Sequence, residues 1–146
     1  ANRAGRREAL TALSRVVVHV DGGSRGNPGP AAVGAVATDP DGGPVGECKA
    51  YIGVATNNVA EYRAVLLGLE LARELGASEV EVVNDSELVA RQIEGRYKVK
   101  NAGLKPLYLE TMRQLHGFKA WSVRSVRRES NERADELVNE ALDAAG

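Results

Sequence analysis

The sequence has few of the features that are typical of extracellular or membrane-bound proteins. Its single cysteine, Cys48, excludes an internal disulfide framework and leaves no second thiol for a CxxC zinc site. No apolar run is long enough to cross a membrane, and residues 1–14 are rich in arginine and lack the apolar segment of a signal peptide. We therefore expect a cytoplasmic protein without a membrane partner, in which residues 1–14 form a flexible leader and residues 15–146 form one domain.

The sequence also lacks an excess of positive or negative charge. The chain has 19 Lys and Arg residues and 20 Asp and Glu residues, which gives a net charge of −1. This balance argues against strong non-specific attraction to a polyanion. If the partner is a nucleic acid, the contacts must be local or bridged by metal ions.

The hydrophobic pattern alternates between strand and helix periods along the chain. The expected strands span residues 16–20, 33–38, 45–54, 80–83 and 121–126, and the expected helices span residues 59–75, 85–95, 104–115 and 131–145. Short Gly- and Pro-containing turns make the first three strands antiparallel, and helical crossovers favour placing the last two strands parallel to the first. The pattern predicts an α/β fold with a five-stranded mixed sheet flanked by helices.

Four acidic residues stand at or near the starts of loops and helices. They are Asp21 after the first strand, Glu61 at the start of the long helix, Asp85 after the fourth strand and Asp135 at the start of the last helix. If the first, fourth and fifth strands are parallel, these carboxylates gather at one end of the sheet. Crowded carboxylates repel one another unless they are protonated or bridged by cations. Oxygen donors without His or Cys suit Mg²⁺ or Mn²⁺ rather than zinc.

Each carboxylate also has a purely structural alternative. Asn58 and Glu61 have the spacing of a capping box. Asp85 is a natural helix N-cap, and Asp135 could complement the dipole of the last helix. The segment after Asp21, GSRGNPGP from Gly23 to Pro30, is not a dinucleotide fingerprint, because a strand rather than a helix is expected next.

Four segments together carry a family resemblance. In this order and spacing, DGGSRGNPGP, TNNVAEY, NDSELV and NERADEL resemble type 1 ribonuclease H from about residue 16 to residue 145. The similarity is greatest to the actinobacterial subgroup in which this domain is joined to a histidine-type phosphatase. The resemblance implies a ribonuclease H-like fold and an endoribonuclease that cuts the RNA strand of RNA/DNA hybrids, leaving 5′-phosphate and 3′-hydroxyl ends. It also implies a monomer.

The resemblance assigns roles to particular residues. The positions matching the catalytic carboxylates, which hold two Mg²⁺ ions with Mn²⁺ as a substitute, are Asp21, Glu61, Asp85 and Asp135. The positions matching contacts to the hybrid are Gly22, Gly23, Ser24, Asn27, Asn57 and Asn58, and those matching a pocket for a DNA-strand phosphate are Thr56 and Asn101. Arg128 matches a residue implicated in product release. For Asn27 and Asn101, ordinary turn chemistry is the alternative.

The sequence also departs from the family pattern. Val54 replaces an arginine of the phosphate pocket, and the basic protrusion of many bacterial members is reduced to Arg96, Tyr97, Lys98 and Lys100. Tyr97 either offers a stacking surface or covers the core. We therefore expect modest, steeply salt-dependent affinity for hybrids. The rival interpretations are a non-catalytic hybrid-binding module and a different nuclease or transposase-like enzyme of the same fold.

Overall fold

The computed structural model describes residues 14–146, so nearly all of the predicted leader lies outside the described residues. Ser14 is the exception, because its carbonyl oxygen accepts hydrogen bonds from the backbone N–H groups of Ser78 (2.8 Å) and Glu79 (3.0 Å). Within the described residues, no helix is long and apolar enough to span a membrane.

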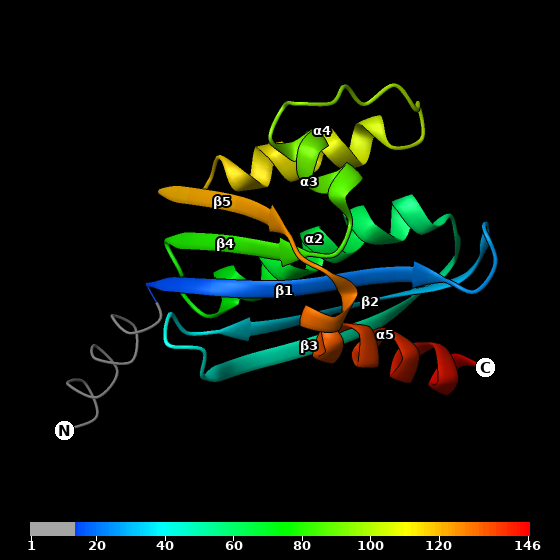
Figure 1. Ribbon diagram of the computed structural model, residues 1–146, viewed down its shortest axis with the longest axis horizontal. Helices are drawn as coiled ribbons and strands as arrows, with labels where there is room; N and C mark the ends of the chain where they lie inside the picture. The colour runs from blue at the N-terminus through cyan, green and yellow to red at the C-terminus, as the bar shows by residue number, and fades with distance from the viewer. Residues whose placement is uncertain (1–13) are drawn as a thin grey trace.

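The chain forms one mixed sheet with helices on both faces (Figure 1). The elements are β1 (Arg15–Ser24), β2 (Gly29–Thr38), β3 (Pro44–Ala55), α2 (Asn57–Glu74), β4 (Glu79–Asn84), α3 (Glu87–Ile93), α4 (Lys105–Leu115), β5 (Ala120–Ser125), the short 3₁₀ helix η1 (Arg128–Ser130) and α5 (Glu132–Ala145). The strand order is β3-β2-β1-β4-β5; the pairs β1–β2 and β2–β3 are antiparallel, and β1–β4 and β4–β5 are parallel. The predicted fold class is confirmed.

Alternation along β1 divides the core between the two faces. Val16, Val18 and Val20 are buried on the α2 side, where Gly68 lets the helix come close: a Cβ at Gly68 would lie 2.5 Å from Val20. On the other face α5 packs on β2, and a Cβ at Gly34 would lie 2.8 Å from the carbonyl oxygen of Ala134. These two close approaches fix α2 and α5 on either side of β1.

Strand β1 is longer than predicted. The sequence suggests that the strand ends at Val20, but pairing with β2 continues through Gly22, Gly23 and Ser24, which lie opposite Val33, Ala32 and Ala31. Asp21 is therefore inside the strand and not at its end. The glycine content predicts a turn after Asp21, whereas Gly22 and Gly23 are paired strand residues, and Gly22 leaves room for α2.

Candidate active site

Asp21 lies in β1 opposite Gly34 of β2, on the face that α5 covers. The next residue, Gly22, faces α2. A Cβ at Gly22 would overlap the carbonyl oxygen of Ala60 and lie 2.8 Å from the backbone nitrogen of Glu61. Gly22 thus lets the first turns of α2 touch the strand, and this contact places Glu61 beside Asp21.

The alternative structural roles of Asp85 and Glu61 as helix caps do not hold. Helix α3 is capped by Ser86, whose side-chain oxygen accepts a hydrogen bond from the Val89 N–H (3.2 Å). Helix α2 is capped by Thr56, whose hydroxyl accepts from the Val59 N–H (3.2 Å). Both acidic side chains are therefore left for another role.

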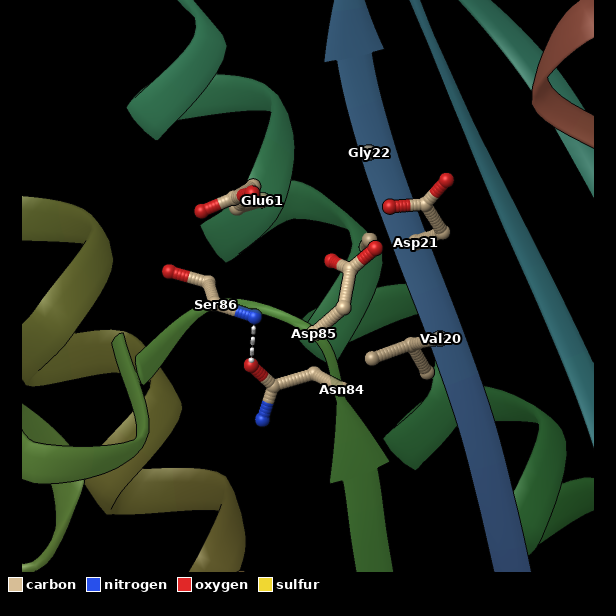
Figure 2. A pocket seen from close by; sticks show the side chains of 8 residues that line it. Val20, Asp21, Gly22, Glu61, Asn84, Asp85 and Ser86 are labelled. Atoms are coloured by element: carbon tan, nitrogen blue, oxygen red, sulfur yellow. Dashed lines mark hydrogen bonds between the residues drawn. The ribbon is translucent and has the colours of Figure 1, made fainter. Parts of the chain in front are cut away.

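The buried Asn84 holds the turn that presents Asp85. Its Oδ1 accepts a hydrogen bond from the Ser86 N–H (2.8 Å), and its Nδ2 donates to the carbonyl oxygen of Arg124 in β5 (3.4 Å). Figure 2 shows the resulting arrangement, with the Asp85 carboxyl group next to that of Asp21 and Glu61 projecting from α2. Asn84 is not among the predicted site residues, although its place between the fourth strand and Asp85 is a signal for such a role.

The carboxyl groups surround two hollows in the surface. Asp21, Gly22 and Glu61 line both of them; Asn84, Asp85 and Ser86 complete one, and Asp135 contributes to the other. The fold thus gathers all four predicted acidic residues near one edge of the sheet, towards the carboxyl ends of β1 and β4, as expected from parallel pairing of these strands.

The local electrostatics are unfavourable for several negative charges. Burial, followed by the charges of Asp85 and Asp135, raises the pKa of Asp21 to about 8. Burial also raises the pKa of Glu61, with Asp85 adding to the rise, while hydrogen bonds from Ser86 and Asn57 oppose it. Excess negative charge of this kind calls for a proton or a cation.

The residues present fit a hard divalent cation. The Oδ2 atom of Asp85 is buried and has no hydrogen-bond partner among the described residues, and the Nε of Arg128 is 3.7 Å away. The donors are carboxylate oxygens, as Mg²⁺ and Mn²⁺ prefer. Across residues 14–146, no three acidic, histidine or cysteine side chains already form a ligand cluster.

Three of the predicted hybrid-contact residues form a connected group. Asn27 Oδ1 accepts a hydrogen bond from the backbone N–H of Asn57 (3.0 Å), and Asn57 Oδ1 accepts one from the N–H of Ser24 (3.4 Å). Ser24 Oγ is buried without a partner. The group joins the β1–β2 turn to the start of α2, beside Gly23 and next to the carboxylates. Asn58 follows in the first turn of α2 and is half-buried.

The remaining predicted residues lie around this group or away from it. Asn101 forms a turn of its own, because its Oδ1 accepts from the N–H groups of Gly103 (2.7 Å) and Leu104 (3.2 Å). Arg128 is 81% exposed and reaches Asp85 from η1. Tyr97 is 46% exposed and does not cover the core; its hydroxyl accepts a hydrogen bond from Arg91 (3.1 Å), whose guanidinium lies over the ring.

Comparison with known proteins agrees with this fold and with these motifs. A family model described as "Reverse transcriptase-like" matches residues 19–141. Ribonuclease HI of Halobacterium salinarum is 47% identical over 131 residues, which are 90% of this chain and 66% of that protein. A bifunctional protein of Mycobacterium tuberculosis is 48% identical over 132 residues, and the match covers 90% of this chain and 36% of that protein.

Solved structures give the same result. The Halobacterium enzyme superposes with a TM-score of 0.87 at 47% identity, covering 89% of this chain and 98% of that chain. LC11-RNase H1, solved in complex with an RNA/DNA hybrid, superposes with a TM-score of 0.85 at 45% identity, and the match covers 89% of this chain and 98% of that chain. The fold and the sequence define a ribonuclease H-like domain. The chain belongs to the type 1 ribonuclease H family, and the predicted resemblance is confirmed.

Proposed function

We propose that this chain is an endoribonuclease that hydrolyses the RNA strand of RNA/DNA hybrids with the help of two divalent cations. The main observation is the contact between Asp21 and Asp85, where one carboxyl group has a raised pKa and the other has a buried oxygen without a partner. A protein gains nothing in stability from two such groups. The hybrid-bound LC11-RNase H1 relative supports this substrate.

The four carboxylates would hold the cations. Asp21 and Asp85 face each other from neighbouring strands, Glu61 approaches from α2 and Asp135 from α5. When bound, Mg²⁺ or Mn²⁺ lowers the pKa of a water molecule and stabilises the departing 3′ oxygen. Cleavage of the bond between phosphorus and this 3′ oxygen would leave 5′-phosphate and 3′-hydroxyl ends.

Selection for RNA would depend on the group formed by Ser24, Asn27 and Asn57. Hydroxyl and amide side chains both donate and accept hydrogen bonds, so they can contact 2′-hydroxyl groups without reading base sequence. Thr56 and Asn101 would contact the DNA strand, and Arg128 would assist product release from its exposed position beside Asp85. Action as a cytoplasmic monomer is part of the same proposal.

The test is cleavage of an end-labelled RNA/DNA hybrid in Mg²⁺ by the wild-type chain and by Asp85→Asn. We expect the substitution to reduce the rate more than about 100-fold, because even changes to the outer shell of a metal site cost 10–100-fold. Asp41→Asn, in the exposed turn before β3, is the matched control and should cut like wild type. Hybrid that is bound but left intact by the wild-type chain would favour the binding-module interpretation. Cleavage of DNA alone would favour a different nuclease of this fold.

A further inference from the structure

Asn131 stands where a helix N-cap is expected, directly before α5, but its side chain makes no capping hydrogen bond. Instead, its Nδ2 donates a 2.8 Å hydrogen bond to the carbonyl oxygen of Val20 in β1. Val20 is 111 positions earlier in the chain. A residue suited to local capping is therefore used for a long-range contact.

This contact joins the backbone segments that carry two of the acidic residues. Val20 directly precedes Asp21 in β1. The carbonyl oxygen of Asn131 accepts a hydrogen bond from the N–H of Asp135 (3.2 Å) in the first turn of α5. One residue thus connects, through its side chain and its main chain, the strand of Asp21 and the helix turn of Asp135.

The position of the Asn131 side chain also has a cost in stability. Asn131 is 3% exposed, and its Oδ1 is buried with no hydrogen-bond partner in the described part of the chain. A buried acceptor without a donor is destabilising, whereas an Asn that capped α5 would have used this same oxygen. Within residues 14–146, the bond to Val20 is the one hydrogen bond that this side chain makes.

We propose that Asn131 is a positioning residue that sets the distance between the Asp21 and Asp135 carboxyl groups. This inference rests on the proposed function, because it concerns the same site. Its action is indirect, because Asn131 is not among the residues that line the two hollows around the carboxylates. Loss of the Nδ2 donor would let the first turn of α5 move away from β1, and the carboxyl groups would no longer hold the same cations.

The experiment compares Asn131→Ala and Asn131→Asp with the wild-type chain. Asp keeps the shape of the side chain and is as good an N-cap as Asn, but its carboxylate cannot donate to the Val20 carbonyl oxygen. We expect both variants to lower kcat on the hybrid by about tenfold to a hundredfold. The KM for the hybrid should change by less than about twofold, because the contact residues around Ser24 are untouched. Isothermal calorimetry should also show weaker Mg²⁺ binding without substrate.

A matched control separates positioning from general loss of stability. Thr111 is fully buried in α4, far from the carboxylates in sequence, and its hydroxyl donates to the Leu107 carbonyl oxygen (2.8 Å). Thr111→Ala removes a buried hydrogen bond of the same kind and should lower the melting temperature while kcat and Mg²⁺ binding stay at wild-type values.

Wild-type kcat and Mg²⁺ binding in Asn131→Ala would overturn the inference, as would losses no larger than those of Thr111→Ala. A loss in Asn131→Asp alone would assign the effect to the added charge and would equally overturn it. If the wild-type chain cuts no hybrid, the proposed function fails, but the calorimetric comparison still decides whether Asn131 positions the carboxylates.

Discussion

Asp21 combines burial with negative neighbours. It is 9% exposed, and Asp85 and Asp135 both lie close enough to act on its charge. These surroundings raise its pKa from 3.8 to about 8. In the folded chain without metal, Asp21 therefore keeps a proton at pH values at which the unfolded chain has already released it.

The raised pKa of Asp21 determines how the stability of the fold changes with pH. Below about pH 4 Asp21 is protonated in both states, and between pH 4 and about 8 only the folded state holds the proton. The free energy of unfolding without metal should therefore fall as the pH rises through this window. Asp21→Asn removes the effect, so this variant should be more stable than the wild type at pH 8 and nearly equal to it at pH 4. Denaturant unfolding in EDTA at both pH values measures the difference.

The control for this prediction is Asp41→Asn, in an exposed turn. It should leave the pH profile of the wild type unchanged. Adding Mg²⁺ at pH 8 should stabilise the wild type, because a ligand that binds only the folded state shifts the equilibrium toward it. An unfolding free energy that rises from pH 4 to pH 8 would contradict the raised pKa of Asp21.

The contact between β1 and the first turns of α2 depends on Gly22. A Cβ at Gly22 would overlap the Ala60 carbonyl oxygen, which is backbone and cannot rotate away. At Gly23, the next residue, the nearest atoms to a Cβ would be Asn57 Oδ1 at 3.7 Å and Val138 at 3.8 Å. Neither glycine has a positive φ, so backbone strain does not distinguish them. The two positions differ only in the space beside them.

Gly22→Ala should therefore destabilise the fold by about 1–3 kcal/mol, the usual cost of forcing extra atoms into a packed site. Gly23→Ala is the matched control and should change the free energy of unfolding by much less. Urea unfolding of both variants beside the wild type gives the comparison. Equal losses of unfolding free energy in the two variants would show that α2 moves easily and that Gly22 does not fix the position of the helix.

At the level of elements, the sequence was sufficient for the order and type of strands and helices but not for their ends. The change from strand to helix period reflects burial on one face, which is local information, so βββαβααβα was predictable. The extension of β1 through Gly22–Ser24 depends on pairing with β2 and on room for α2, which are tertiary effects. The caps were misassigned for a related reason. Several polar residues precede α2 and α3, and only the packing decides that Thr56 and Ser86 accept the capping bonds.

The candidate site was likewise predictable only in part. The gathering of the four acidic residues followed from strand order, because parallel strands bring their carboxyl ends to one edge of the sheet. The hydrogen bonds by which Asn84 and Asn131 support the site were not predictable, since each goes to a carbonyl oxygen that is distant in the sequence: Arg124 for Asn84 and Val20 for Asn131. Side-chain bonds of this kind leave no periodic trace in a sequence.

For the molecule as a whole, a net charge of −1 means that binding to a hybrid must depend on where the basic residues lie. Exposed Lys98 and Lys100 follow α3 in the segment that leads to α4 (Figure 1), and Lys119 lies before β5, at the opposite end of the parallel strands from the carboxylates. We therefore expect Lys98 and Lys100, and not Lys119, to contact a bound backbone.

Hybrid binding should therefore weaken steeply with salt, and the lysines should contribute unequally. In an Asp85→Asn background, which keeps the hybrid intact, we expect Lys98→Ala and Lys100→Ala each to reduce the slope of log K against log salt by about one. Lys119→Ala removes the same charge from the remote end and should leave the slope unchanged. Fluorescence anisotropy with a labelled hybrid, titrated over a range of KCl concentrations, measures all three. A slope that falls equally in the three variants would mean that overall charge, and not a defined path across the segment between α3 and α4, governs binding.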